Sequence, residues 1–239
     1  MRTLKHEPGS EMIDKFGEVG QALDVVEDGM TVAIGGFNTP GMPALLADGL
    51  RSRGLRDLVV VANGAGTGTS GLAGLIIDGC VRKVVCSFPL NPAAEDVGRK
   101  LVAGEVEVEL TPQGMIAERL RAAGAGLGGI LSPTGVGTAF AEGKETMTVA
   151  GRDFLLESPI QPDVALIKAE EADRWGNLRF RLASRNFNVP MATAARWTIA
   201  QVRQRRELGE IDPSSVDLPG IFVDAVTCEE NASVAPVPQ

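Results

Sequence analysis

The sequence predicts an α/β fold, in which an open, mostly parallel and partly mixed sheet carries helices on both faces. Two apolar runs, at residues 31–34 and 58–62, are rich in β-branched residues, as in strands that are buried on both sides. Stretches with apolar residues three and four positions apart alternate with such runs, which indicates successive βα units. With 239 residues, 44% of them hydrophobic, the chain is long enough to bury one large core.

The first half of the chain predicts a regular alternation of helices and strands. After a polar leader at residues 1–9, apolar residues at helical spacing predict a helix over residues 10–26, and a strand follows at residues 31–34. The further strands are expected at residues 58–62, 83–88 and 105–110, and the helices at residues 43–53, 71–78, 92–103 and 112–123.

The second half predicts shorter and more closely spaced elements. Residues 124–143 contain seven glycines and are expected to form a loop-rich region that can serve a site. The expected strands are residues 154–157, 164–168, 177–181, 198–202 and 221–226, with a helix at residues 190–196. We expect these strands to join one mixed sheet, so that residues 10–230 form a single domain and residues 231–239 a flexible tail.

Composition excludes several classes of function. A net charge of −8 argues against nucleic-acid binding, because phosphate recognition needs clustered Lys and Arg. No signal peptide and no apolar run of membrane-spanning length is found, so no contact with a membrane is expected. The three cysteines, Cys80, Cys86 and Cys228, form no close pair, which favours a reducing, cytoplasmic location. The single histidine, His6, lies in the polar leader and is no obvious general base.

The turn after the first predicted strand is the strongest candidate for a binding site. Gly35 and Gly36 lack a Cβ, so the backbone there can approach a ligand closely, and Pro43 can begin the next helix. Such a loop lies at the carboxyl edge of the sheet, where open α/β proteins bind ligands. A merely structural connection between strand and helix explains the same glycines equally well.

Other motifs are weaker. Residues 66–71 and 124–129 both match G-x-G-x-x-G, but the first lacks an acid at the end of the next strand and the second follows a helix. The chain has no P-loop string, and one histidine with scattered cysteines builds no metal site. The second half is rich in acids, and a carboxylate can act as a nucleophile. The six that we consider are each more simply a surface charge or a partner of an arginine: Glu142, Glu145, Glu157, Glu170, Glu171 and Asp173.

The cations and amides of residues 174–181 and 185–188 could hold a substrate carboxylate. An edge strand with outward arginines and a structural Asn turn is the simpler explanation for most of them.

The glycine turn also carries a family resemblance. The string Asp28-Gly29, followed by Val32 to Phe37, Gly41 and Pro43, resembles the signature of the first subunit of family I coenzyme A-transferases. The resemblance covers residues 24–226 and includes the strings VVANGAG (60–66), LTPQG (110–114), SPTGVGTAFAEGKE (132–145) and residues 173–188. Within the family it is strongest to subunits that act on 3-oxoadipate, and the neighbouring subgroups act on acetoacetate or exchange acetate or butyrate with acetoacetate.

The resemblance implies a CoA-transferase type of fold and a ping-pong reaction on CoA thioesters, with no permanently bound cofactor. The nucleophile of the family is a glutamate in a Ser-Glu-Asn-Gly string of a different, partner subunit, and this chain has no such string. We therefore expect a heterodimer or heterotetramer with this partner subunit, a succinyl-CoA donor, a 3-oxo acid acceptor, and no catalytic residue in this chain.

The resemblance also assigns the binding residues. Those implied to contact CoA or the acyl group are Gly35, Gly36, Phe37, Asn38, Thr39, Pro40 and Gly41. Asn63 and Gln113 are implied to line the acyl pocket. The chain departs from the family pattern at Asn38, where many relatives have glycine, and at Gly64, where asparagine is common. Two alternatives follow for Asn38: either the loop backbone is less free there than in relatives, or Asn38 adopts a left-handed conformation.

Overall fold

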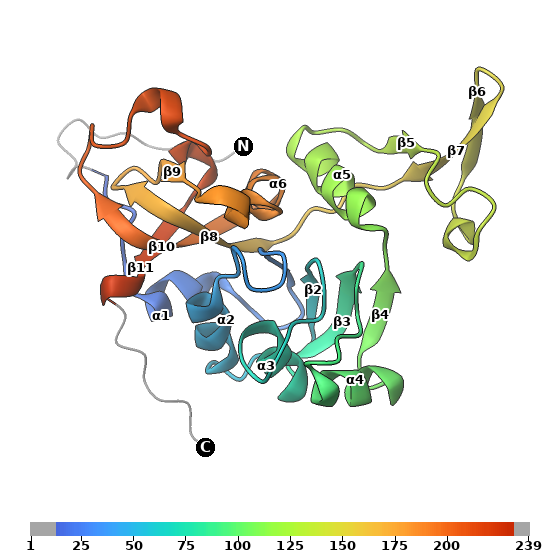
Figure 1. Cartoon of the computed structure of the whole chain (residues 1–239), viewed down its shortest axis with the longest axis horizontal. Coiled ribbons are helices and arrows are strands. Elements are labelled where there is room, and N and C mark those ends of the chain that lie inside the picture. The colour runs from blue at the N-terminus through green and yellow to red at the C-terminus, as the bar shows by residue number, and fades with distance from the viewer. Residues whose placement is uncertain (1–12, 232–239) are drawn as a thin grey trace.

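A large parallel sheet forms the centre of the molecule in the computed structural model, which describes residues 13–231 (Figure 1). Its strand order is β11-β10-β8-β1-β2-β3-β4, every neighbouring pair is parallel, and the short β9 pairs antiparallel with β8. The strands are β1 (Thr31–Ile34), β2 (Leu58–Val61), β3 (Val81–Cys86), β4 (Glu107–Leu110), β8 (Val164–Asp173), β9 (Leu178–Arg179), β10 (Trp197–Arg206) and β11 (Ala225–Cys228). The predicted mostly parallel α/β sheet is confirmed.

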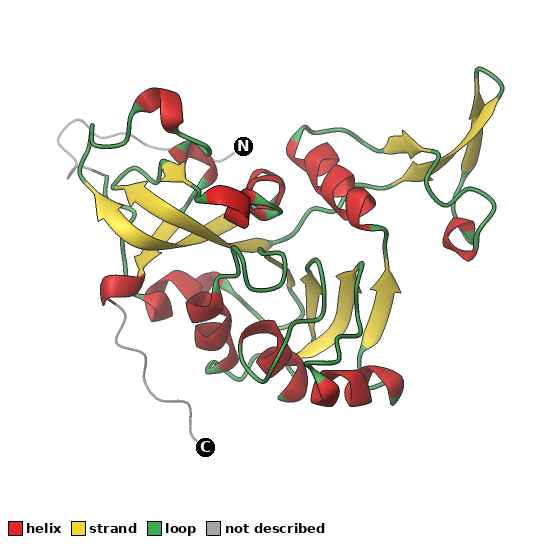
Figure 2. Ribbon diagram, viewed as in Figure 1, coloured by secondary structure: helices red, strands yellow, loops and turns green. Residues whose placement is uncertain are grey.

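Helices cover both faces of this sheet, as the sequence predicts (Figure 2). The helices are α1 (Val19–Ala22), α2 (Ala44–Arg51), α3 (Gly71–Ile77), α4 (Glu95–Val102), α5 (Gln113–Gly124) and α6 (Asn188–Ala194). One core cluster includes Leu46 of α2 and Leu75 of α3, and the other includes Leu120 of α5 and Met191 of α6. Each face of the sheet therefore has its own apolar core, which explains the nearly continuous apolar composition of β1 and β2.

The predicted helix over residues 10–26 is wrong for half of its described part. Residues 13–18 form no helix and contain one bridge residue, Phe16, and only α1 and the 3-10 turn Leu23–Val25 are helical. Phe16 forms a parallel bridge with Val226, the Gly17 N–H donates to the Val226 carbonyl at 2.9 Å, and the Val226 N–H donates to the Lys15 carbonyl at 2.8 Å. Long-range pairing with β11 therefore overrides the local helical spacing. The predicted leader at residues 1–9 and almost all of the predicted tail lie outside the described residues.

The expectation that all of the later strands join one mixed sheet holds for β8 to β11 and is wrong for the strand predicted at residues 154–157. A second sheet of order β5-β7-β6 stands apart from the first and is antiparallel throughout. Its strands are β5 (Ile130–Ser132), β6 (Thr146–Val149) and β7 (Arg152–Glu157). The residues predicted as a strand at 154–157 lie in β7, and β5 lies inside the region expected to be loop-rich. The three strands β5, β6 and β7 pair only with one another, and none of them pairs with a strand of the parallel sheet.

Two further strands differ from their predicted bounds. The predicted strand at residues 221–226 begins as the 3-10 turn Gly220–Phe222, and β11 starts only at Ala225. A Cβ on Gly220 would lie 2.2 Å from the Trp175 carbonyl oxygen, so the chain is bent closely around this contact before it becomes extended. The predicted strand at residues 177–181 shortens to β9, which pairs with β8 at only two positions.

The three cysteines are buried, and they are unpaired, as the lack of a close pair in the sequence predicts. Burial raises the pKa of the Cys86 thiol to about 11, so this group is protonated near neutral pH. Within residues 13–231, no helix has the length and apolar character that crossing a membrane requires.

Candidate functional site

The glycine turn lies at the switch point of the main sheet. From β1 the chain proceeds outward through β2, β3 and β4, and then returns to place β8 on the other side of β1. The turn of residues 35–41 leaves the carboxyl end of β1 between these two halves, and the Gly35 N–H donates to the Leu166 carbonyl of β8 at 2.9 Å. Ligands of open α/β proteins bind at this point, since the loops on its two sides diverge there.

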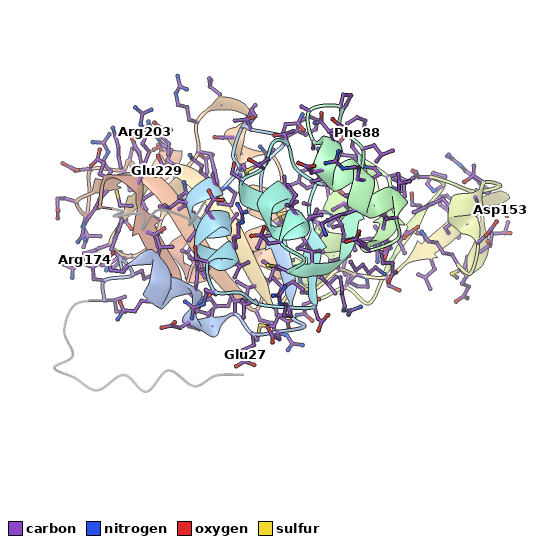
Figure 3. All side chains as sticks on the ribbon, turned by 90° about the horizontal axis from the view of Figure 1, so that it is seen from below. Glu27, Phe88, Asp153, Arg174, Arg203 and Glu229 are labelled. Carbon is purple, nitrogen blue, oxygen red and sulfur yellow. The ribbon has the colours of Figure 1, made fainter. Side chains whose placement is uncertain are left out.

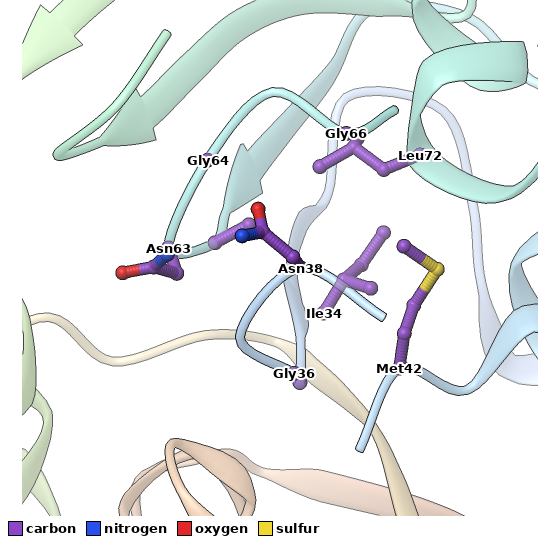
Figure 4. A pocket seen from close by; sticks show the side chains of 10 residues that line it. Ile34, Gly36, Asn38, Met42, Asn63, Gly64, Gly66 and Leu72 are labelled. Carbon is purple, nitrogen blue, oxygen red and sulfur yellow. The ribbon is translucent and has the colours of Figure 1, made fainter. Parts of the chain in front are cut away.

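A small pocket opens between this turn and the loop that follows β2 (Figure 4). Its lining residues come from β1, the glycine turn, the β2 loop and the start of α3. They are Ile34, Gly35, Gly36, Asn38, Met42, Ala62, Asn63, Gly64, Gly66 and Leu72. Figure 4 shows the Asn38 side chain extending from the glycine turn toward the loop of Asn63 and Gly64. The structure thus brings together four of the predicted site residues, Gly35, Gly36, Asn38 and Asn63.

The backbone of the turn has conformations that depend on its residue types. Gly36 has φ +112° and Gly41 has φ +76°, and a Cβ on Gly36 would lie 2.9 Å from both Cα and N of Met42. Asn38 has φ +53°, so of the two alternatives for this position the left-handed conformation is the one observed. The Phe37 N–H donates to the Pro40 carbonyl at 3.0 Å and closes the turn, so that Phe37 and Asn38 are exposed.

A buried asparagine holds both ends of the turn. The Asn188 side chain is completely buried, its Nδ2 donates to the carbonyl oxygens of Gly41 (3.1 Å) and Ser184 (2.6 Å), and its Oδ1 accepts from the Lys168 N–H (3.1 Å). A Cβ on Gly35 would lie 1.9 Å from this Oδ1. Only glycine fits at position 35, because any Cβ there would overlap the Asn188 amide.

A second asparagine of the same segment adds to this contact. Asn186 Nδ2 donates to the Pro40 carbonyl at 3.0 Å and to the Ala183 carbonyl at 2.9 Å. For the amides of the sequence string 185–188, the structure therefore supports the structural interpretation over direct binding of a substrate carboxylate.

The start of α2, just after the turn, is held by a side chain from another strand. Pro43 precedes α2 and supplies no side-chain cap, and instead Gln201 of β10 accepts at Oε1 from the N–H groups of Leu45 (3.0 Å) and Leu46 (3.4 Å). Gln201 Nε2 donates to Glu229 Oε1 at 2.5 Å, and Lys168 Nζ lies 2.6 Å from the same oxygen. Burial raises the pKa of Glu229, but the hydrogen bonds from Lys168 and Gln201 outweigh it and hold this pKa below its usual value.

Sequence reasoning missed this role of Gln201, Lys168 and Glu229. Gln201 is visible in the sequence only as a member of a predicted strand, and it lies 156 residues from Leu45 along the chain. The ionised Glu229 carboxylate accepts from Gln201 Nε2 and so fixes the orientation of the Gln201 amide. Gln201 Oε1 therefore faces the first N–H groups of α2.

The two predicted acyl-pocket residues are placed differently. Asn63 is 6% exposed and lines the pocket, and its carbonyl accepts from the Ser87 hydroxyl at 2.9 Å. Gln113 is exposed at the start of α5, beyond β4, and is not among the described residues that line the pocket. At Gly64, the other departure from the family pattern, a Cβ would lie 3.0 Å from the Phe88 carbonyl oxygen, which explains a small residue there.

The chemistry of the pocket is limited to binding. None of the described residues that line it carries a carboxylate, imidazole, thiol, hydroxyl or cationic side chain. Within residues 13–231, no cluster of three or more His, Cys, Asp or Glu side chains could hold a metal ion. The N–H of Gly71, which ends the first G-x-G-x-x-G string, donates to Asp48 Oδ1 at 2.7 Å and is thus already occupied at the start of α3.

The acids considered as nucleophiles lie elsewhere and several are paired. Glu157 contacts Lys144 at 2.7 Å, and Glu171 contacts Arg206 at 2.7 Å. Asp173 accepts from the N–H groups of Trp175 and Asn177, each at 3.0 Å. Glu157, Glu171 and Asp173 are buried, so their carboxylates are stabilised by these protein partners rather than by water.

Comparison with known proteins is consistent with this geometry. The family model described as coenzyme A transferase matches residues 18–229. The chain is 49% identical over 227 residues to the first subunit of 3-oxoadipate CoA-transferase of Pseudomonas putida, covering 95% of this chain and 98% of that protein. It is 46% identical over 211 residues to the first subunit of succinyl-CoA:3-ketoacid coenzyme A transferase of Xanthomonas campestris pv. campestris (strain B100), covering 88% and 86% of the two chains.

Among solved structures, the fold resembles the acyl-CoA transferase of Escherichia coli O157:H7, which was solved as a thioester complex with CoA. The TM-score is 0.81 at 21% identity, over 95% of this chain and 52% of that one. This chain therefore spans about half of that protein.

The contact between Gly35 and Asn188 is testable by a double-mutant cycle. Gly35→Ala places a methyl group on Asn188 Oδ1, and we expect it to lower the free energy of unfolding by about 1 to 3 kcal/mol. In the Asn188→Ala background the same change should cost much less, because the obstructing amide is gone. Chemical denaturation of the unchanged protein, the two single variants and the double variant measures the loss of unfolding free energy on Gly35→Ala in both backgrounds.

The matched control for this cycle is Gly20→Ala. Gly20 lies in α1, where an added Cβ would meet no atom within 4 Å. The free energy of unfolding of the Gly20→Ala variant should therefore stay near that of the unchanged protein. Equal costs of Gly35→Ala with and without the Asn188 amide would contradict the role given to this contact.

Proposed function

We propose that this chain, which belongs to the coenzyme A transferase family, is the first subunit of a two-chain enzyme that moves CoA from succinyl-CoA to 3-oxoadipate. The identity of 49% to the Pseudomonas putida subunit, over nearly the whole of both chains, supports this choice of acceptor. The similar proteins are themselves named as single subunits of larger enzymes, which implies a partner subunit for this chain as well.

The composition of the pocket supports the proposal most strongly: a ligand pocket at the switch point of the sheet has walls of glycine backbone and asparagine, but no reactive group. Such a pocket can bind and polarise a thioester, whereas cleavage of the thioester requires a nucleophile. The proposed nucleophile is a glutamate in a Ser-Glu-Asn-Gly string of the partner subunit, which meets this pocket across the subunit interface.

The glycine turn is proposed to bind CoA or the acyl group through Gly35, Gly36, Phe37, Asn38, Thr39, Pro40 and Gly41. Within residues 13–231, the backbone N–H groups of Gly36 and Asn38 donate no hydrogen bond to another residue. Backbone donors that are held in place without a protein partner can stabilise a developing oxyanion without reorganisation. Asn63 is proposed to line the acyl group, and Gln113 could do so only beyond the rim of the pocket.

In the proposed reaction, the glutamate carboxylate of the partner subunit attacks the thioester carbonyl of succinyl-CoA, and the carbonyl oxygen becomes an oxyanion beside the glycine turn. Collapse of this intermediate expels the CoA thiolate and leaves an acyl-glutamyl anhydride. The thiolate then attacks the glutamyl carbonyl, which releases succinate and leaves a glutamyl-CoA thioester. The 3-oxo acid carboxylate repeats these steps in reverse, so no permanently bound cofactor is needed.

Three buried free thiols fit a reducing compartment, which supports a cytoplasmic location for the enzyme. The similarity to the Xanthomonas campestris subunit, which is named for a 3-ketoacid, supports a different 3-oxo acid as the second candidate acceptor, and we propose acetoacetate for it.

The proposal is tested by assaying this chain alone and together with its partner subunit. We expect negligible transfer of CoA by the single chain, because its pocket holds no nucleophile, and full activity from the pair. The pair should have a higher kcat/KM for 3-oxoadipate than for acetoacetate. Substantial activity of the single chain would refute the two-chain proposal, and a preference for acetoacetate would refute the proposed acceptor. Binding of CoA by a stable assembly of this chain alone would favour a non-catalytic acyl-CoA-binding module.

The glycine turn is tested by Gly36→Val in the two-chain enzyme. A branched side chain at φ +112° would press on Met42 and displace the backbone donors, so kcat should fall by about 10²-fold or more. Gly20→Val, at an exposed position of α1, serves as the control. If the Gly36→Val enzyme assembles normally and keeps its kcat, the turn does not contact the reacting group.

A further inference from the structure

Three polar residues form a row along the carboxyl edge of the main sheet, next to the glycine turn. Asn63 follows β2, Ser87 follows β3 and Thr111 follows β4. The parallel register of these strands continues past their ends, which places Asn63 beside Ser87 and Ser87 beside Thr111. Of the three, Asn63 alone is among the described residues that line the pocket. The side chain of Ser87 therefore acts on the pocket, if at all, through Asn63.

Ser87 is bonded to Asn63 through both its backbone and its side chain. The N–H groups of Ser87 (3.1 Å) and Phe88 (3.3 Å) donate to the Asn63 carbonyl oxygen. Phe88 is 55% exposed, and Figure 3 shows it at the surface of the molecule. Because successive side chains of an extended segment alternate in direction, the Ser87 side chain is directed inward. Its hydroxyl donates to the Asn63 carbonyl oxygen at 2.9 Å and to Asn63 Oδ1 at 3.3 Å.

The contact with Ser87 occupies the oxygen of the Asn63 amide and leaves its nitrogen available. Figure 4 shows this oxygen directed away from Asn38. Within residues 13–231, Asn63 Nδ2 donates no hydrogen bond, although the Asn63 side chain is buried. Because the oxygen and the nitrogen diverge from Cγ, holding the oxygen also fixes the direction of the nitrogen. A donor of a buried amide is costly to leave unpaired, so Nδ2 is ready to bond to a ligand in the pocket.

The acyl groups of the proposed substrates require this orientation of the amide. A thioester carbonyl, a 3-oxo group and an ionised carboxylate all contain oxygen acceptors and no N–H or O–H donor. An asparagine can therefore bond to them only through Nδ2, whereas Oδ1 would repel them. A hydroxyl at position 87 supplies the donor that Oδ1 needs, and it thereby selects the orientation of Asn63 that suits an acyl group.

We propose that Ser87 is a positioning residue of the site: its hydroxyl holds Asn63 Oδ1, so that Asn63 Nδ2 donates to an oxygen of the acyl group. The inference rests on the proposed function and deepens it, because it assigns the donor that binds the acyl group and the residue that orients this donor. Ser87 acts through Asn63 and is not itself a catalytic residue.

The test is a double-mutant cycle in the two-chain enzyme, with kcat/KM measured separately for succinyl-CoA and for 3-oxoadipate. Asn63→Ala removes the donor and should lower kcat/KM about 100-fold. Ser87→Ala frees the amide to rotate and should lower kcat/KM about 10-fold, whereas Ser87→Thr keeps the hydroxyl and should retain most of the activity. In the Asn63→Ala background, Ser87→Ala should have almost no further effect, because the amide that it positions is absent.

Asn63→Asp tests which end of the amide faces the acyl group. The aspartate can still accept from the Ser87 hydroxyl, but a second oxygen replaces Nδ2. We expect a loss of kcat/KM at least as large as on Asn63→Ala, because this oxygen repels an acyl oxygen. An equal loss for both substrates assigns the bond to the carbonyl oxygen at the reacting carbon, which both acyl groups have. A loss confined to 3-oxoadipate assigns the bond to its 3-oxo group.

The matched control is Thr111→Val, which removes a hydroxyl from the next position of the same row and keeps the shape of the side chain. Thr111 is buried, and within residues 13–231 its Oγ1 has no hydrogen-bond partner. The kcat/KM values of this variant should equal those of the unchanged enzyme for both substrates.

Chemical denaturation of the same variants measures the contact between Ser87 and Asn63 without activity. The losses of unfolding free energy on Ser87→Ala and Asn63→Ala should be non-additive, because the two side chains share a hydrogen bond.

Three results would overturn the inference while leaving the proposed function intact. They are additive losses of unfolding free energy, an equal effect of Ser87→Ala on kcat/KM with and without the Asn63 amide, and an Asn63→Asp enzyme as active as the unchanged one. Failure of the proposed function is distinguishable from these results. The unchanged pair of subunits then transfers no CoA, which also removes the acyl ligand, although the losses of unfolding free energy remain non-additive.

Discussion

The buried amide of Asn188 is the contact on which the candidate site depends. It joins three segments: the end of the glycine turn at Gly41, the bend at Ser184 and the middle of β8 at Lys168. A fully buried amide is costly unless its donors and its acceptor are satisfied, and here each has a backbone partner. The same amide leaves no space for a side chain at Gly35. The turn is therefore shaped by packing from outside, in addition to the freedom of its own glycines.

Two supports from opposite directions keep the turn fixed. Asn188 acts from α6 on the side of β8, and Gln201 acts from β10 on the first N–H groups of α2. The Gln201 amide is oriented by Glu229, whose charge is balanced by Lys168. Because Lys168 also donates its backbone N–H to Asn188, both supports meet at one residue of β8. A preorganised backbone of this kind suits the proposed role of binding and polarising a thioester while another chain supplies the nucleophile.

The sequence predicts well those features that depend on local chemistry. β1 and β2 follow from short β-branched runs, and the left-handed Asn38 follows from its place at a position where relatives have glycine. The features it misses depend on distant contacts. Residues 13–18 have helical spacing but pair with Val226, and Asn188 lies 147 residues from the Gly41 carbonyl that it binds. In the small antiparallel sheet, β7 is predicted in part, but β5 and β6 escape prediction because they are short and Leu131, Met147 and Val149 are exposed, so no strong periodic pattern results.

In the proposed enzyme, this chain supplies the binding walls and the partner subunit supplies the reacting carboxylate. The most direct test of this division is to mix the assembled enzyme with succinyl-CoA, without an acceptor acid, and to measure the intact mass of each chain. We expect the partner subunit to gain the mass of one CoA less one water, as a glutamyl-CoA thioester requires, while this chain keeps its mass. A CoA adduct on this chain would contradict the proposed division of roles.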